Sequence, residues 1–226
     1  MIEYILNRSK RKTTAIYVRN GVVEVRAPLR APVESIDRFV ASKEKWILSK
    51  LGQLQEQSEQ RNAFSLNYGD CVLYRGAFYP IVGVSEKKQQ GFDGDSFNII
   101  LGLTSEEIKA QCINIYRSLA RVVVAEKISH YAEVMSLYPD KINLRINNAK
   151  SRWGSCSFKS INIAWRIIMA EDDAIDYLVV HELAHIYEMN HGSRFWAIVE
   201  RVLPDYKMRK QKLRQLQDKQ DREDWG

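Results

Sequence analysis

Towards its C-terminus the chain reads Ile175-Asp176-Tyr177-Leu178-Val179-Val180-His181-Glu182-Leu183-Ala184-His185-Ile186-Tyr187-Glu188-Met189-Asn190-His191. The first part of this stretch is strongly apolar, which predicts a helix that faces the protein core. Residues four apart on a helix point the same way, so His181 and His185 can hold one metal ion between them. Glu182 lies one step round the helix, where its carboxylate can take a proton from water bound to that ion. The stretch therefore predicts a metal-dependent hydrolase.

A catalytic metal site requires three protein ligands and one open position for water. His191 can be the third ligand only if the chain turns away from the helix before it. Glu188 shares a helix face with His181 and His185 and is the alternative, but a rigid helix cannot bring three ligands spread over two turns to one tetrahedral ion. We therefore expect the metal to be bound by His181, His185 and His191. Glu182 is expected to act as general base and later as proton donor. Imidazole ligation favours one zinc ion per chain, although manganese, nickel or cobalt can occupy such a site.

The composition is that of an ordinary globular protein. The chain has 226 residues, of which 45% are hydrophobic and 27% charged, enough for a sizeable core. Its three cysteines are too few for a disulfide framework. The N-terminus lacks the charged lead and apolar run of a secretory signal, so we expect a reducing cytoplasm. No apolar run approaches the ~18 residues of a membrane span, so no membrane partner is expected. The net charge of +6 favours anionic partners or substrates.

The N-terminal half is predicted to be mainly β-structure with one inserted helix. Two β-rich runs at 13–18 and 22–27 flank Asn20-Gly21, whose residues tolerate positive φ, and this pattern predicts a β-hairpin. Apolar residues at helical spacing predict one helix from residue 32 to about residue 57. Further short strands are expected at 71–75, 78–84 and 97–101, with a polar turn at 89–95.

The C-terminal half is predicted to open with a long helix and a small sheet. Thr104-Ser105-Glu106-Glu107 is a capping-box signature, and the helix that it starts should run to about Leu137, with Pro139 closing it. Strands are expected at 142–146, 153–157 and 161–165, with a turn at 158–160 between the last two.

The remaining residues are predicted to be helical. The histidine-bearing helix should begin at the acidic residues 171–173, which suit the positive end of a helix dipole, and should end near Met189. Ser193 should cap a short helix to about Val202, and a charged helix should follow Pro204. These elements predict an α+β fold. We expect a β-rich region with one inserted helix at 1–103 and a metallohydrolase core with a charged C-terminal helix at 104–226.

The strand expected at 153–157 is a candidate for substrate binding. Free N–H and C=O groups at a sheet edge can pair with an extended peptide, and Gly154 would let a substrate backbone approach closely. The candidate substrate-binding residues are Arg152, Trp153, Gly154, Ser155, Asn162 and Arg166. The alternative for Trp153 and Trp165 is an ordinary place in the sheet core. The alternative for the two arginines is an ion pair with the acidic residues at 171–173.

Several short motifs around the histidine helix are similar to those of a known family. They are Ser151-Arg152-Trp153-Gly154-Ser155-Cys156, Ile161-Asn162-Ile163-Ala164-Trp165-Arg166, Asp176-Tyr177-Leu178-Val179-Val180-His181-Glu182-Leu183-Ala184-His185, Met189-Asn190-His191, Arg194-Phe195-Trp196 and Pro204-Asp205-Tyr206. These motifs resemble the YgjP-like metallopeptidase family, a bacterial group of zincin type related to the SprT-like and WLM peptidases. The likeness is dense from about 104 to 214 and looser around Tyr68-Gly69-Asp70. It implies peptidase activity and a compact zincin-like core, with a long helix, a small antiparallel-containing sheet, an active-site helix and C-terminal helices.

Three functions are compatible with these residues. The leading one is a zinc-dependent metallopeptidase in which Glu182 activates metal-bound water. The second is a nucleotide phosphoanhydride hydrolase (a pyrophosphatase) at the same metal, although no Gly-rich phosphate loop supports it. This second function is suggested by a set of basic residues that can bind phosphate, namely Lys150, Arg152, Arg166 and Arg194. The third is a nucleic-acid-associated protein with a structural metal, which the basic charge suits but a free Glu182 does not. The residues set neither the bond cleaved nor the oligomeric state.

Overall fold

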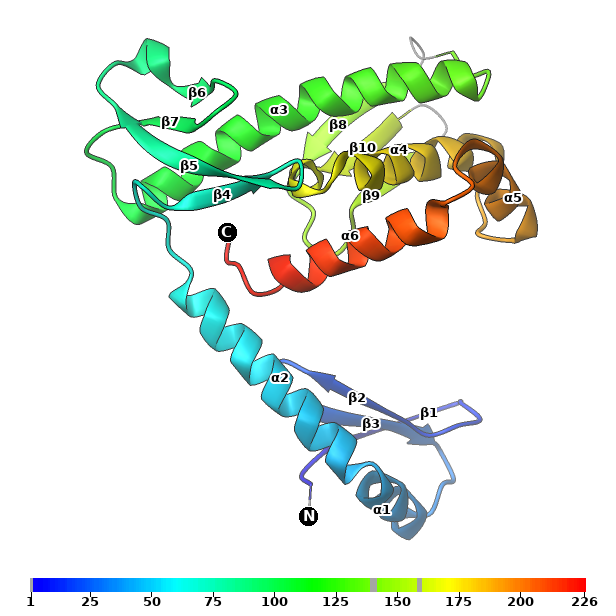
Figure 1. The fold of residues 1–226 in the computed structure, drawn as a ribbon. Coiled ribbons are helices and arrows are strands. Elements are labelled where there is room, and N and C mark those ends of the chain that lie inside the picture. Colours follow the sequence, from blue (N-terminus) through cyan, green and yellow to red (C-terminus); the bar gives the residue numbers. More distant parts are fainter. Residues whose placement is uncertain (1, 139–141, 158–159) are drawn as a thin grey trace. The chain divides into compact units, whose positions relative to one another are not determined.

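The computed structural model describes residues 2–138, 142–157 and 160–226, and Figure 1 shows their fold. Helices and small mixed sheets make up the chain, which confirms the predicted α+β class. The chain divides into two compact units, Met1–Phe64 with Asp221–Asp224 and Ser65–Gln220 with Trp225–Gly226. Within the described ranges, no helix is both long and apolar enough to cross a membrane.

The N-terminal unit contains a three-stranded sheet in the order β1-β3-β2. β2 (Ala15–Arg19) and β3 (Val22–Pro28) are antiparallel. Asn20 and Gly21 join them with φ angles of 50° and 74°, which confirms the predicted hairpin. β1 (Ile5–Ser9), which the sequence pattern did not reveal, runs parallel to β3 on its other side.

Two helices, α1 (Val33–Ser42) and α2 (Glu44–Ala63), replace the single helix predicted from residue 32 to about residue 57, so that prediction was wrong. The chain leaves helical geometry at Lys43, where φ is −108° and ψ is 8°. The two helices and β3 share an apolar cluster of Val23, Val25, Ala27, Ile36, Val40 and Ile47. Because both helices bury residues in one cluster, the apolar periodicity continues across Lys43 and conceals the break.

The second unit opens with a four-stranded sheet in the order β4-β5-β7-β6. Its elements are β4 (Cys71–Tyr74), β5 (Ala77–Val84), the short 3-10 helix η1 (Lys87–Gln89), β6 (Gly91–Phe92) and β7 (Phe97–Ile100). β4, β5 and β7 confirm the three predicted strands. β6 lies where a polar turn was predicted. The ring of Phe92 accounts for the difference, since its centroid lies 4.7 Å from that of Tyr74 and 5.2 Å from that of Phe97, inside an aromatic cluster.

The long helix α3 (Ser105–Val134) confirms the capping-box prediction. The N–H of Glu107 donates to Oγ1 of Thr104 at 3.4 Å, and the N–H of Thr104 donates to Oε2 of Glu107 at 2.8 Å. The helix ends at Val134, a little before the predicted end, and Pro139 lies outside the described residues.

Three strands after α3 form a sheet whose strand β9 packs against the histidine helix α4. They are β8 (Asn143–Asn147), β9 (Gly154–Ser157) and β10 (Ser160–Ala164), which confirms the three predicted strands. β10 is central, parallel to β8 and antiparallel to β9, so β9 is an edge strand of the sheet as described. The last strand stops before Trp165, because a buried 3-10 helix, η3 (Trp165–Met169), begins there. The predicted turn at 158–160 falls partly outside the described residues.

The sheet of β4–β7 packs with these later elements. The hydroxyl of Tyr116 in α3 donates to the carbonyl of Leu73 at 2.7 Å. The N–H of Arg75 donates to the carbonyl of Ile168 in η3 at 2.9 Å. The division between the two compact units therefore comes after Phe64, whereas the sequence suggested a boundary at 103/104.

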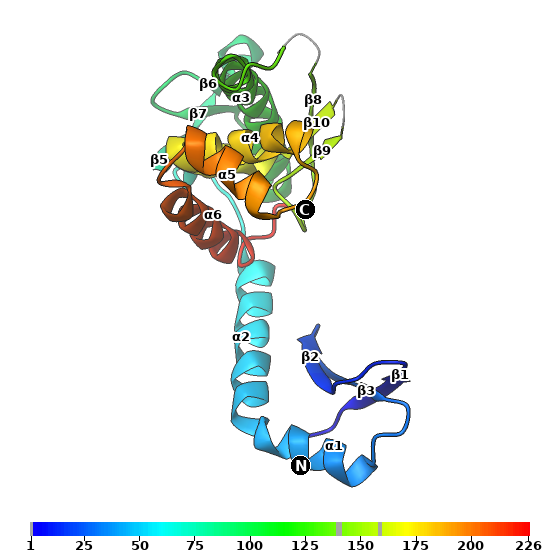
Figure 2. The ribbon, with the colours of Figure 1, turned by 90° about the vertical axis from the view of Figure 1, so that its right-hand side faces the viewer.

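Three helices complete the second unit, namely α4 (Asp172–Tyr187), α5 (Ser193–Val202) and α6 (Tyr206–Gln220). α4 is the histidine helix, and α5 and α6 both pack against it (Figure 2). α4 ends just before the predicted Met189. Gly192 occupies the N-cap position of α5 and no side chain caps that helix, so the predicted cap by Ser193 was wrong.

Cations from three other elements hold the acidic start of α4. The ion pairs are Arg75–Asp172, Lys127–Asp176 at 2.6 Å, Arg209–Asp176 at 3.4 Å, Lys212–Asp173 at 2.6 Å and Lys212–Glu171 at 2.7 Å. Arg152 and Arg166, the partners suggested by the sequence, are not among them, so that alternative was wrong. The cations come instead from the β4–β5 turn, from α3 and from α6, which sequence distance alone could not reveal.

Candidate metal centre

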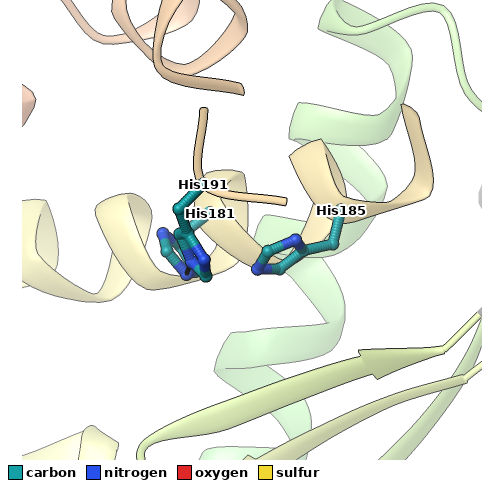
Figure 3. Close-up of side chains that lie close together, drawn as sticks. All are labelled: His181, His185 and His191. Carbon is teal, nitrogen blue, oxygen red and sulfur yellow. Dashed lines mark hydrogen bonds between the residues drawn. The ribbon is translucent and has the colours of Figure 1, made fainter. Parts of the chain in front are cut away.

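The three clustered histidines come together at the C-terminal end of α4. His181 and His185 project from the helix, and His191 returns from the segment after it (Figure 3). One nitrogen of each ring lies within 4.8 Å of the others. The Nε2 atoms of His181 and His191 are 3.1 Å apart. A tetrahedral ion with Zn–N bonds of about 2.0–2.1 Å would set its ligand nitrogens about 3.3 Å apart, so this group fits a metal ion.

The chain reaches this arrangement because α4 stops at Tyr187. Glu188 leaves helical geometry, with an extended backbone at φ −140° and ψ 109°. The segment that follows it carries His191 back towards the helix. The backbone carbonyl of Glu188 lies 3.2 Å from Nδ1 of His185. If Nδ1 carries the proton, its N–H donates to this carbonyl and Nε2 is left for the metal. Histidines that bind metals commonly make such a hydrogen bond with their other ring nitrogen. Glu188, the alternative third ligand, thus meets the site through its carbonyl, and its carboxylate is outside the three-histidine group.

Phe195 of α5 packs against all three imidazoles. Its ring centroid lies 4.9 Å from that of His181 and 4.6 Å from those of His185 and His191, and its side chain is fully buried. The sequence showed only an apolar residue of the Arg194-Phe195-Trp196 motif. No polarity or spacing marked Phe195 as a support of the metal site.

We expect Phe195→Ala to lower the free energy of unfolding by about 3–5 kcal/mol, because it leaves a cavity in the core. The imidazoles would also lose their common packing surface, and we expect metal affinity to fall by about tenfold. Val199→Ala is the matched control, since Val199 is equally buried on α5 but lies outside the ring cluster. Denaturant unfolding and competitive metal titration measure the two effects. Equal metal affinity in the two variants would contradict a supporting role for Phe195.

His181 and His191 are held in the neutral form that metal binding requires. Burial lowers the pKa of His181 to about 3, and the nearby His185, His191 and Lys210 lower it further. Burial also lowers the pKa of His191, helped by the charge of Lys210. Both rings therefore keep a free lone pair at neutral pH.

Glu182, next to the first histidine, is buried beside the same site. Only 3% of its surface is exposed, and Oε2 has no hydrogen-bond partner among the described residues. Burial raises the pKa of Glu182 to about 7, while the positive charge of Arg152 acts in the opposite direction. A buried carboxylate oxygen without a partner is costly for a fold to keep, and such groups are frequent at functional sites.

Gly154, the first residue of β9, lies directly against Glu182. A Cβ atom at position 154 would be 2.4 Å from Oε1 of Glu182 and 2.7 Å from its Cδ. No real Cβ approaches another atom so closely, so only glycine fits while Glu182 keeps its place. The sequence predicted that Gly154 makes room for a substrate backbone, and the structure places the Glu182 side chain in that space.

A cleft of about 290 Å³ opens beside His181 and Glu182. Its walls come from β9, α4 and α6, and its lining residues are Trp153, Gly154, Tyr177, Leu178, His181, Glu182, Lys210, Leu213, Arg214 and Gln217. Trp153 and Gly154 are two of the predicted substrate-binding residues. Arg152 does not line the cleft, but its charge acts on Glu182 at the cleft wall.

The other predicted substrate contacts lie elsewhere. Ser155 and Asn162 face each other in the β9–β10 register, and neither lines the cleft. Arg166 is buried, donates to Oδ1 of Asn148 at 2.8 Å and stacks over the ring of Trp165. The structure thus brings Arg166 into the core and away from the cleft. Trp165 is fully buried, in agreement with the core alternative for that residue.

The cleft residues on α6 were missed from the sequence. Lys210, Arg214 and Gln217 follow the spacing of one helix face, which groups them together. However, nothing in the sequence connects the last helix with the histidine motif. Only the packing of α6 against α4 brings the two together.

A group of three imidazoles and a buried glutamate at a cleft is the kind of site that metal-dependent hydrolases use. The comparison with protein families agrees, because the model for the YgjP-like metallopeptidase domain matches residues 12–216. The chain belongs to this YgjP-like family, which confirms the resemblance seen in its motifs. Its membership supports a metal-dependent hydrolase with a catalytic metal.

Among solved structures, the chain is similar to the metallopeptidase zymogen abylysin of Pyrococcus abyssi. The two are 25% identical, the match covers 40% of this chain and 90% of abylysin, and the TM-score is 0.37. A search of curated proteins found no match.

Proposed function

We propose that this protein is a zinc-dependent metallopeptidase in which His181, His185 and His191 hold the ion and Glu182 is the general base. The observation that carries this proposal is the convergence of three imidazoles beside a buried carboxylate, one oxygen of which has no hydrogen-bond partner among the described residues, at one cleft. Membership of a metallopeptidase family supports the same reaction class.

The proposed roles follow from the surroundings of each group. A zinc ion, when bound, supplies Lewis acidity that lowers the pKa of water to about 7 and polarises a carbonyl group. Glu182, with its pKa raised to about 7, is suited to accept a proton from the attacking water near neutral pH. The same carboxyl group can then donate that proton to the leaving amine. Buried walls around Glu182 keep other water from this carboxylate.

The edge position of β9 favours a peptide substrate. β9 pairs with β10 on one side only, so backbone groups on its other side are available to an extended chain within the described sheet. Gly154 and the preceding Trp153 line the cleft, so a peptide laid along β9 would pass Glu182. A nucleotide has no backbone of this kind to pair with a strand.

Metal analysis tests the ligand set. We expect protein purified without a histidine tag to bind one zinc ion per chain. Replacing His181, His185 or His191 with alanine should lower the affinity by more than the about 10- to 100-fold that loss of an outer-shell partner costs. His130→Ala is the matched control, because this remaining histidine lies on α3 outside the group and should not affect zinc binding.

The substrate class is tested in parallel. Zinc-loaded protein is offered casein-like peptides and nucleoside triphosphates, and peptide cleavage is the expected result. Phosphate release that requires Glu182, without peptide cleavage, would overturn the peptidase assignment. Zinc binding that persists when any of the three clustered histidines is replaced would overturn the proposed ligand set.

A further inference from the structure

The α6 wall of the cleft carries two positive charges. Lys210 and Arg214 lie four residues apart on α6, and both line the cleft that contains Glu182. Side chains with this spacing share one helix face, so the two cations point to the same side of the helix. Together they form the basic wall of the cleft.

These two cations differ from their neighbours on the same helix. Arg209 is paired with Asp205 at 2.8 Å, and Lys212 with Asp173 at 2.6 Å. Neither Lys210 nor Arg214 has an acidic partner among the residues that the structure describes. The fold thus pairs Arg209 and Lys212 with acidic side chains, whereas Lys210 and Arg214 at the cleft form no ion pair among the described residues.

Lys210 is also placed beside the metal site. Its Nζ lies 4.6 Å from the ring centroid of Trp196, whose ring is in turn 5.8 Å from that of His191. A ligand bound at Lys210 would therefore lie next to the reacting groups.

The rest of the cleft suits a peptide side chain. Trp153, Leu178 and Leu213 supply apolar walls, and Glu182 is the only acidic residue among the described residues of the lining. A volume of about 290 Å³ admits a side chain and adjoining backbone but not a large ligand. An apolar pocket with two cations at one wall is complementary to a short chain that ends in a carboxylate.

We propose that the basic wall formed by Lys210 and Arg214 selects peptides that present a carboxylate beside the scissile bond. This inference rests on the proposed function and adds the substrate class to it. The ammonium group of Lys210 and the guanidinium group of Arg214 bind the carboxylate by charge-assisted hydrogen bonds. The carboxylate is that of an aspartate or glutamate side chain or that of a peptide C-terminus.

Binding to the Glu182→Gln protein tests this selection without requiring turnover. The zinc-loaded variant is titrated with fluorescent peptides that have an amidated C-terminus and differ only in Glu, Gln or Lys at one position. A Gln peptide with a free terminal carboxylate forms the second arm. We expect the Glu peptide, the free-acid peptide or both to bind at least about tenfold more tightly than the amidated Gln peptide. Which of them binds identifies the source of the carboxylate.

Charge reversal assigns the preference to α6. Lys210→Glu with Arg214→Glu in the same background should remove the preference and favour the Lys peptide. Lys207→Glu is the matched control, since Lys207 carries the same charge on α6 but lies outside the cleft lining, and it should leave the preference unchanged. Thermal unfolding of both proteins shows that the fold is kept. Equal binding of all four peptides (the amidated Glu, Gln and Lys peptides and the free-acid Gln peptide), no binding of any peptide, or a preference that survives charge reversal overturns the proposal.

Cleavage assays on protein with Glu182 intact separate the two proposals. Cleavage of neutral and acidic peptides at equal rates would leave the peptidase function in place and overturn the role of the basic wall. If no peptide is cleaved but peptides that carry a carboxylate still bind more tightly, the peptidase function is overturned and the role of the basic wall stands.

Discussion

Glu182→Gln is expected to keep its zinc and to lose peptide cleavage by about 10²- to 10⁴-fold, the usual contribution of general acid–base catalysis. The side chain stays nearly the same in shape, so the buried site should accept it, but an amide cannot take a proton from water. The expected loss is in kcat, while peptide binding remains. Steady-state kinetics together with metal content per chain measure both parts of this result.

Glu188→Gln is the matched control for that experiment. It makes the same chemical change at a glutamate whose backbone carbonyl, and not its carboxylate, contacts His185. Both zinc content and turnover should stay near those of the unaltered protein. Normal hydrolysis by the Glu182→Gln protein would remove Glu182 from the mechanism, and loss of zinc from Glu188→Gln would restore Glu188 as a candidate ligand.

Gly154→Ala is expected to reduce turnover by about 100-fold although it adds one methyl group. The new Cβ would lie 2.4 Å from Oε1 of Glu182, so either the carboxylate or β9 must move. A displacement of about 1 Å at a catalytic group can cost about 100-fold in rate. The three atoms nearest the added Cβ all belong to Glu182 and none to the clustered histidines, so metal content should be retained.

Gly52→Ala provides the comparison for Gly154→Ala. A Cβ at position 52 meets no atom within 4 Å, and the residue lies in the helix α2, where alanine is favoured over glycine. We expect unchanged turnover and equal or higher stability. If Gly154→Ala were as active as Gly52→Ala, the close packing of β9 on Glu182 would have no catalytic importance.

Local chemistry in the sequence was sufficient to predict the histidine group. The four-residue spacing of His181 and His185 places both on one face of a helix, and the need for a turn before His191 follows from helix geometry. The structure brings the three side chains together. The hairpin at Asn20-Gly21 and the capping box at Thr104 were predictable for the same reason, since each depends on neighbouring residues.

Features that depend on distant residues could not be predicted in this way. β1 is short and mostly exposed, so its pairing with β3 leaves no strong pattern in the sequence. The cations that hold the start of α4 come from three separate elements, and a charge gives no sign of which element it will meet. The same holds for Lys210 and Arg214, whose importance arises only when α6 packs beside α4.

The ion pairs at the start of α4 have a consequence for how the metal site is assembled. A helix is stiff along its axis, so anchoring its first turns also fixes the direction of the side chains further along. His181 and His185 are therefore preorganised, and the loss of conformational freedom that their alignment requires occurs when the protein folds. His191 follows the end of the helix, so its position depends instead on the segment after α4 and on the ring of Phe195, 4.6 Å away.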